Sequence, residues 1–359
     1  YNALASNTTA SNNTAVGYGA LLLNTTGASN VGLGFQALYS NTTAANGSAL
    51  GHNALFNNTT GASNTAVGKS ALENNTTGAT NVAFGAQALN DNTTADSNTA
   101  VGWSSLSKNT TGTANTGVGE SSLRNATTGD NNTGLGFNAL GAAVVTGDNN
   151  TAVGKDAGAA ITSGANNTAV GHTALLANTT GVDNVGLGAD TLLGNVTGDA
   201  NTAVGRGALA SNSTADNNTA VGRSALLNNT TGASNVAVGV NSLDACTTGD
   251  ANTSVGVDAG GAITTGNNNV CIGLQAGNHD GAIVTGGQNT MIGNYTDTNA
   301  TDADNVNAFG YNVTGAEGYT TLGVAANDIR AAHGNVTWAT VSDQRYKKDI
   351  VDSTAGLSF

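Results

Sequence analysis

A period of 17 residues is the feature that most constrains this chain. A segment such as Thr65-Ala66-Val67-Gly68 closes on a glycine that recurs along most of the sequence, with one slip of a single residue. We call this residue the motif glycine. We call a rung the stretch that begins six residues before one motif glycine and ends seven residues before the next. A fixed period of about this length is typical of a solenoid, in which a rung buries its apolar face only by stacking on its neighbours. The motif glycines of the regular part are Gly17, Gly34, Gly51, Gly68, Gly85, Gly102, Gly119, Gly136, Gly154, Gly171, Gly188, Gly205, Gly222, Gly239, Gly256 and Gly273.

The residues just before each motif glycine predict a short β-strand. A branched or aromatic residue directly precedes the glycine, and the residue before that is almost always Ala or Gly. Alternation with a period of two is the pattern of a strand with two unlike faces. We interpret the branched residues as one column of the core, and the leucines four positions after the glycine as another. This interpretation places in the core Val16, Leu21, Leu33, Val67, Leu72, Phe84, Val101, Leu106, Val204 and Leu209.

Three rungs lack the leucine and have Gly158, Gly260 or Gly277 in its place. Two of them carry an isoleucine three residues later, and the longer third rung has Ile283 and Val284. We interpret this as one core position that is filled from two backbone positions, with Ile161 and Ile263 as the substitutes. The small Ala/Gly face would adjoin either the opposite wall of the rung or a second chain, and the sequence leaves both open.

The segment Asn-Thr-Thr-Gly predicts the turn of each rung, because Gly tolerates positive φ and Asn and Thr side chains bond nearby backbone. The same segment creates many Asn-x-Ser/Thr sequences, for example at Asn24, Asn58 and Asn109, which are either the turn itself or glycosylation sites. The predicted fold is an all-β parallel β-solenoid of about 17 rungs. At about 4.8 Å per rung, such a rod is on the order of 80 Å long.

The order of the repeat divides the chain into three parts. Residues 1–293 form the predicted solenoid shaft, and residues 294–341 form an aromatic-rich cap or connector. Residues 342–359 begin a further domain. The chain starts within a rung at Tyr1 and without Met, so we expect the natural protein to be longer. The aromatic residues of the cap are Tyr295, Phe309, Tyr311, Tyr319 and Trp338.

Composition argues against several classes of partner. The net charge is −13 and no basic stripe is visible, so we do not expect a nucleic-acid partner. No apolar run is long enough to span a bilayer, so we expect no direct membrane insertion. Cys246 and Cys271 lie at different phases of the repeat, and we expect them to act as small unpaired residues.

No constellation of residues predicts a cofactor or a metal. Asp297, Asp302 and Asp304 make a small acidic loop, but the spacing of a calcium loop is missing. His52 and His172 follow motif glycines, and we expect them to be solvated on the outer face.

The repeat Asn-Thr-Ala-Val-Gly resembles the head repeats of trimeric autotransporter adhesins, and more closely the 17-residue arrays of tail-fibre-like proteins. The resemblance covers about four-fifths of the chain. It implies a left-handed parallel β-roll and a parallel homotrimer. The rung is longer here than in the adhesin heads, and we assign the additional residues to the turn.

A second, shorter resemblance lies at the C-terminus. The pattern Ser342-Asp343-x-Arg345-x-Lys347-x-x-Ile350 is similar to the start of the intramolecular chaperone domain of phage tail fibres and tailspikes. That family trimerises, assists folding and then cuts itself off beside the serine. The resemblance implies that Ser342 is the nucleophile and Lys347 its base.

These features favour a structural and binding protein over an enzyme. We predict the shaft of a homotrimeric fibre that is extracellular, in a virion tail fibre or a cell-surface appendage, and that binds a cell-surface receptor or glycan. An ice-binding solenoid is the alternative, since Thr recurs in every rung, although the paired threonines lie in the turn. A glycan-cleaving enzyme would need carboxylates gathered in a groove between chains, and the acidic residues are too scattered to name a pair.

Overall fold

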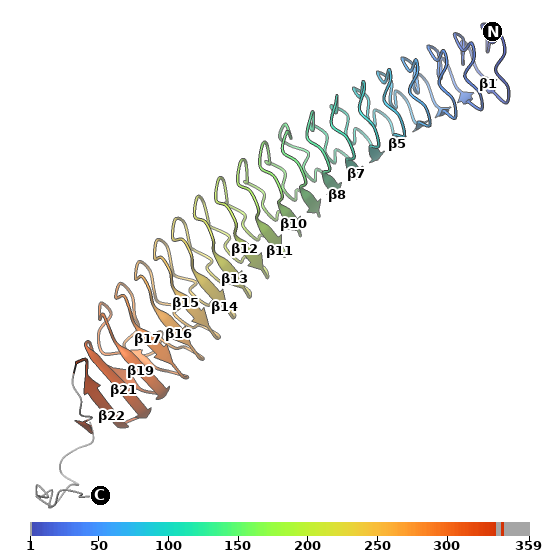
Figure 1. Cartoon of the computed structure of the whole chain (residues 1–359). Helices are drawn as coiled ribbons and strands as arrows, with labels where there is room; N and C mark the ends of the chain where they lie inside the picture. Colours follow the sequence, from blue (N-terminus) through green and yellow to red (C-terminus); the bar gives the residue numbers. More distant parts are fainter. Residues whose placement is uncertain (1, 335–338, 341–359) are drawn as a thin grey trace, which may run out of the picture.

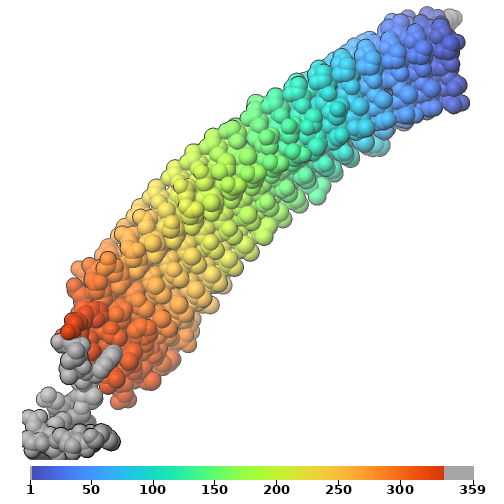
Figure 2. Space-filling view, in the orientation of Figure 1, coloured from blue at the N-terminus to red at the C-terminus, as the bar shows by residue number. Residues whose placement is uncertain are grey.

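The computed structural model describes residues 2–334 and 339–340, and the chain forms one continuous, gently curved rod (Figures 1 and 2). Each rung contributes one short strand, and no helix occurs in this described part. The strands are β1 (Thr14–Val16), β2 (Val31–Leu33), β3 (Ser48–Leu50), β4 (Thr65–Val67), β5 (Val82–Phe84), β6 (Thr99–Val101), β7 (Thr116–Val118), β8 (Thr133–Leu135), β9 (Thr151–Val153), β10 (Thr168–Val170), β11 (Val185–Leu187), β12 (Thr202–Val204), β13 (Thr219–Val221), β14 (Val236–Val238), β15 (Thr253–Val255), β16 (Val270–Ile272), β17 (Thr290–Ile292), β18 (Asp297–Thr298), β19 (Asn307–Tyr311), β20 (Thr314–Gly315), β21 (Tyr319–Val324), β22 (Asn327–Ala332) and β23 (Ala339–Thr340).

The strands pair in parallel and in rung register. Val67 of β4 stands opposite Phe84 of β5, and Phe84 stands opposite Val101 of β6. The same register continues through β17, β19 and β21, so that equivalent residues form columns along the rod. The all-β parallel β-solenoid is therefore confirmed, with about 18 turns.

On the strands, the residue that points into the core is not the predicted one. Phe84 is 57% exposed, whereas the neighbouring Ala83 is fully buried, and β2 to β17 all have a buried middle residue and a third residue that is not buried. The predicted core positions Val16, Leu33, Val67, Phe84, Val101 and Val204 are therefore wrong, because their side chains point outward. The predicted leucines Leu21, Leu72, Leu106 and Leu209 are fully buried, as expected.

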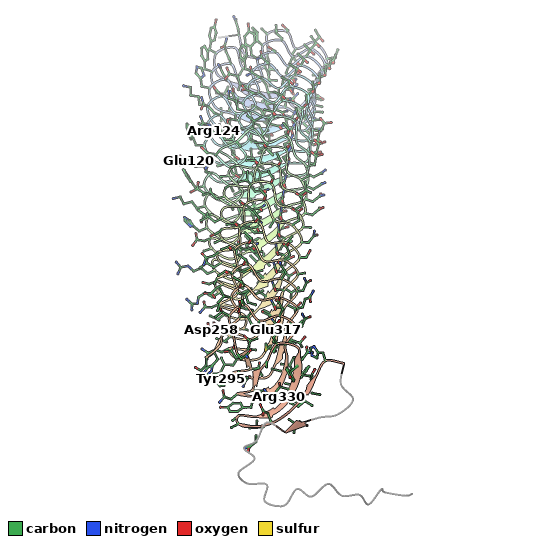
Figure 3. All side chains as sticks on the ribbon, turned by 90° about the vertical axis from the view of Figure 1, so that its left-hand side faces the viewer. Glu120, Arg124, Asp258, Tyr295, Glu317 and Arg330 are labelled. Carbon is green, nitrogen blue, oxygen red and sulfur yellow. The ribbon has the colours of Figure 1, made fainter. Side chains whose placement is uncertain are left out.

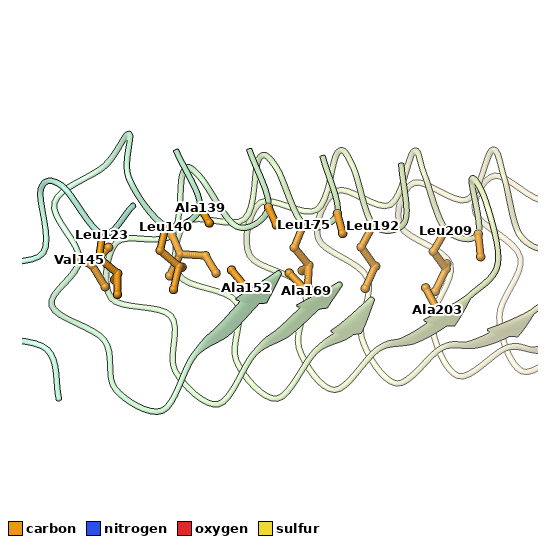
Figure 4. Packing of buried hydrophobic residues seen from close by; sticks show 14 of the residues in the cluster. Leu123, Ala139, Leu140, Val145, Ala152, Ala169, Leu175, Leu192, Ala203 and Leu209 are labelled. Carbon is orange, nitrogen blue, oxygen red and sulfur yellow. The ribbon is translucent and has the colours of Figure 1, made fainter. Parts of the chain in front are cut away.

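The width of the rung explains why the small residue faces inward. Leucines line the middle of the rod and leave little room on the strand opposite them (Figure 4). A Cβ added at Gly117 would lie 3.3 Å from Leu106 Cγ, and one at Gly32 would lie 3.4 Å from Leu21 Cγ. The small face thus adjoins the opposite wall of its own rod, which resolves the alternative left open by the sequence.

The predicted exchange of core positions is confirmed. Ile161, Ile263 and Ile283 are buried in the three rungs that lack the leucine. A Cβ added at Gly158 would lie 3.0 Å from Ile161 Cδ1, which shows that the isoleucine occupies the space of the missing side chain.

Two ladders of buried asparagine complete the interior, and the sequence interpretation missed them. In the turn ladder, Asn75 Nδ2 donates to Asn58 Oδ1 at 2.7 Å and to the Gly78 carbonyl at 2.9 Å. In the second ladder, just before the strands, the Asn98 backbone N–H donates to Asn81 Oδ1 at 2.9 Å. Each such bond contributes about 1 kcal/mol net, whereas an unpaired buried amide costs about 1–3 kcal/mol.

The asparagine ladders also show whether the Asn-x-Thr sequences serve as turns or as glycosylation sites. Asn24, Asn58 and Asn109 are at most 1% exposed, so their amide nitrogens are not accessible in the folded rod. The turn interpretation therefore holds at these three positions.

The C-terminal end of the described solenoid has a different construction. β22 pairs antiparallel with β21, so the hydrogen-bonding edge of the last parallel strand is covered. Beside it, the short strands β18 and β20 form a separate parallel pair. Tyr295 contacts Tyr311 edge-on, with ring centroids 5.8 Å apart.

Candidate functional site

The outward side of the strands carries an unbroken column of apolar side chains. We call this column, formed by the third residue of β1–β17 and β19, the apolar column. None of its members is buried, and Val16 and Phe84 are more than half exposed. Because the strands are in register, neighbouring members lie about 4.8 Å apart. The apolar column consists of Val16, Leu33, Leu50, Val67, Phe84, Val101, Val118, Leu135, Val153, Val170, Leu187, Val204, Val221, Val238, Val255, Ile272, Ile292 and Phe309.

The first residue of each strand forms a second outward column beside the apolar one. Most rungs place Thr there, as at Thr65, and several place Val, as at Val82. The two columns together make a regular surface two side chains wide, which we call the strand face.

One edge of the strand face carries aromatic and basic residues. This edge, which we call the basic edge, is formed by the residue that follows each motif glycine. Near the N-terminus the rings of Tyr18, Phe35 and His52 stack, with centroids 5.4 and 4.9 Å apart. His52 and His172 are exposed as predicted, although His52 packs on Phe35 rather than standing free in solvent.

Side chains one to five residues after a motif glycine project from one common side of the rod. Figure 3 shows Glu120, Arg124 and Asp258 on one side of the molecule. The Arg124 guanidinium carbon lies 5.9 Å from the centroid of the Trp103 ring, which is within the range of a cation–π contact.

The other edge of the strand face is acidic. Six residues before the motif glycine, several rungs carry an aspartate whose Oδ1 accepts the backbone N–H of the preceding rung. For example, Asp199 accepts from Val182 at 2.8 Å, and Asp216 accepts from Asp199 at 2.7 Å. We call this edge the acidic corner, and it comprises Asp96, Asp130, Asp148, Asp199, Asp216, Asp250 and Asp304.

A shallow hollow of about 540 Å³ interrupts the surface where Gly207 replaces the side chain that other rungs have. Arg206, Arg223 and Asp190 line it, and Arg206 Nε lies 3.8 Å from Asp190 Oδ2. The hollow contains one carboxylate, Asp190, so it does not gather the pair of acids that glycoside hydrolysis uses.

The predicted acidic loop is split by the structure. Asp297 is buried in β18, where its Oδ2 accepts the backbone N–H groups of His279 and Gly281. Burial raises the pKa of the Asp297 carboxyl, and the backbone hydrogen bonds oppose that shift. Asp302 and Asp304 remain exposed. Within residues 2–334 and 339–340, no group of three or more His, Cys, Asp or Glu side chains is placed to hold a metal ion.

The two cysteines are free and buried, as predicted. Cys246 takes the place of a turn-ladder asparagine, and its Sγ lies 3.6 Å from the Gly249 carbonyl oxygen. Burial raises the pKa of Cys246 to about 11 and that of Cys271 to about 12.

We therefore expect neither thiol to react in the folded protein at about pH 8, because the thiolate is the reacting species and the side chains are inaccessible. The measurement is titration with Ellman's reagent before and after unfolding in guanidinium chloride. Both thiols should react only after unfolding. Rapid reaction of one thiol in the native protein would show that its rung opens.

The predicted catalytic pair, Ser342 and Lys347, lies outside the described residues, as does Trp338. The described part of the chain has no helix long and apolar enough to cross a membrane.

Comparisons with family models, with curated proteins and with solved structures gave no match for this chain.

Proposed function

We propose that this chain is the structural shaft of an extracellular fibre, a parallel homotrimer that presents a binding surface to a cell-surface receptor or glycan. The observation that carries the proposal is the apolar column. Monomeric proteins rarely leave a contiguous apolar patch larger than a few hundred Å² in water, and here the apolar side chains follow one another along the whole rod. Packing the strand faces of three copies around a common axis covers the apolar column.

The free energy gained by covering the apolar column grows with the number of rungs. Each half-exposed Val, Leu or Ile side chain gains on the order of 1 kcal/mol when its remaining surface is buried. Since each of β1–β17 and β19 adds one apolar side chain to the column, the gain accumulates along the rod. A shaft that gains stability along its whole length on assembly suits a fibre in a virion or a cell-surface appendage.

The C-terminal resemblance adds a maturation step to the same proposal. Ser342 would cut the chain beside itself with Lys347 as base, which would remove the trimerisation chaperone after assembly. Folding would then be irreversible, and the fibre would be kinetically trapped.

The test is the mass of the intact particle, measured by light scattering at micromolar concentration. We expect three chains per particle. Val101→Asp should disrupt the particle, because the substitution places three carboxylates at one level of an apolar axis. Val144→Asp is the matched control, since Val144 is 54% exposed but lies outside the strands. A wild-type monomer, or equal effects of the two substitutions, would contradict the proposal.

Ice binding is a second candidate, and one observation favours it. The turn threonines that the sequence suggested are engaged, as Thr110 Oγ1 donates to the Thr127 carbonyl at 3.1 Å. The strands, however, place Thr65, Thr99 and Thr116 outward beside the apolar column, in a regular array. Thermal hysteresis of a monomeric wild type that is lost in Thr116→Lys would favour this function over the fibre.

A further inference from the structure

The two edges of the strand face carry opposite charges at equivalent positions of the repeat. Residues 2–334 contain seven Lys and Arg residues, and four of them occupy the single column of the basic edge. The acidic corner contains seven aspartates and no cation at the same position of any rung. The four cations of the basic edge are Lys69, Lys155, Arg206 and Arg223.

Three of the four cations of the basic edge share a rung with an aspartate of the acidic corner. Lys155 shares its rung with Asp148. In the same way, Arg206 shares a rung with Asp199, and Arg223 with Asp216. No rung combines an aspartate of the acidic corner with an acid on the basic edge.

These same-rung pairs do not form within one chain. A three-residue strand lies between the two edges and alone spans about 10 Å. Within the chain, two of the cations instead contact aspartates of the neighbouring column, two residues after a motif glycine. Lys155 Nζ lies 3.7 Å from Asp156 Oδ2, and Arg206 Nε lies 3.8 Å from Asp190 Oδ2. These are exposed pairs of the kind that contribute little to stability.

We propose that copies of this chain pack side by side in parallel and in rung register, with the acidic corner of each copy against the basic edge of the next. Asp148, Asp199 and Asp216 of one copy then face Lys155, Arg206 and Arg223 of its neighbour. The inference rests on the proposed homotrimer and adds what fixes the direction and the axial register of its chains. The apolar column fixes neither the direction nor the register of the chains, because its side chains are of the same kind in every rung.

The direction of packing follows from symmetry. A rotation about an axis parallel to the rod brings the acidic corner of one copy opposite the basic edge of the next. A two-fold axis perpendicular to the rod, which gives antiparallel chains, instead places like edges together. Charge complementarity therefore selects the parallel arrangement.

The register follows from Glu120, the one acid on the basic edge among the regular rungs. In register it faces a neighbour's Thr113, which is uncharged. A slip of one rung in either direction brings Glu120 opposite Asp96 or Asp130. The slip also leaves fewer pairs of opposite charge between the chains. The charge pattern therefore stabilises the in-register arrangement and destabilises the arrangements shifted by one rung.

The decisive experiment is disulfide cross-linking of the full chain in a background without the native thiols, made by Cys246→Asn and Cys271→Ala. The in-register pair Asp199→Cys with Arg206→Cys should link chains under mild oxidation and give covalent oligomers on a non-reducing gel. Its matched control is Val182→Cys with Arg206→Cys, which tests a slip of one rung. Within one chain the strand keeps the in-register pair beyond the reach of a disulfide, which is about 7 Å between Cα atoms.

Preferential cross-linking of the slipped pair would overturn the inference. So would the absence of in-register cross-links in a protein that light scattering shows to be trimeric, and in that case the proposed fibre would stand. A monomeric wild type would remove both proposals.

Charge exchange tests the same contact without new thiols. Arg206→Asp with Arg223→Asp should weaken assembly at least tenfold and more strongly at low salt, because like charges then meet across the interface. Adding Asp199→Arg and Asp216→Arg to the same chain should restore assembly. Failure of this restoration in a folded protein would contradict the pairing.

Discussion

Substitution of the motif glycine Gly102 by alanine should destabilise the rod by at least about 3 kcal/mol, since backbone strain and a steric clash act together. Gly102 has a φ of +130°, a region that residues with a Cβ rarely adopt. A Cβ added there would lie 2.5 Å from the carbonyl oxygen of Gly119 and 2.6 Å from its carbon. Neither atom can move away, because both belong to the backbone of the next rung. The measurement is urea unfolding followed by far-ultraviolet circular dichroism.

The matched control for this substitution is Gly207→Ser. Gly207 has a φ of +70°, and the nearest atom to an added Cβ is 3.7 Å away. Other rungs hold serine at the equivalent position, for example Ser70 and Ser224, with φ of 57° and 59°. We expect a change within about 1 kcal/mol. Equal losses for Gly102→Ala and Gly207→Ser would show that the close stacking of motif glycines does not limit the stability of the rod.

The period, the strand positions and the leucine column could be predicted from the sequence because they depend on phase alone. Once Gly68 and Gly85 are seen to be equivalent, the register of everything between them follows. The exchange of leucine for isoleucine three residues later was predictable for the same reason, since a lost side chain must be replaced nearby in a close-packed core.

The direction in which the strand side chains point could not be predicted in the same way. Alternation of Ala and Val distinguishes two faces, but it does not say which one is inside. General hydrophobicity favours the valine, and the structure has the alanine inside because Leu106 and its equivalents already fill the narrow rung. The asparagine ladders were missed for a related reason, as an Asn-Thr-Thr turn predicts local bonds and gives no sign of bonds between rungs.

The candidate site exists because the valines of the strands point outward and the alanines point inward. With the valines inside, the strand would present only small residues, and no apolar surface would remain to be covered. With the valines outside, the same sequence provides an apolar column between an acidic and a basic edge. The charged positions were visible in the sequence, but their placement beside the strand face required the structure.

The two apolar positions of one rung should therefore respond differently to truncation. Leu106→Ala should cost about 2–5 kcal/mol of stability, because it removes a fully buried side chain and leaves a cavity that neighbouring rungs cannot close. Val101→Ala should cost within about 0.5 kcal/mol in an isolated rod, where its side chain points to solvent. In the assembled fibre, Val101→Ala should weaken the contact between chains instead.

Thermal unfolding at two protein concentrations separates these effects. Dissociation coupled to unfolding makes the melting temperature depend on concentration. We expect Val101→Ala to increase that dependence, and Leu106→Ala to lower the melting temperature by a similar amount at both concentrations. Thr111→Ala, an exposed change in the turn of the same rung, is the control for substitution itself. If Val101→Ala lowered the melting temperature as much as Leu106→Ala at every concentration, the valine would have to lie in the core, and the apolar column could not be an interface.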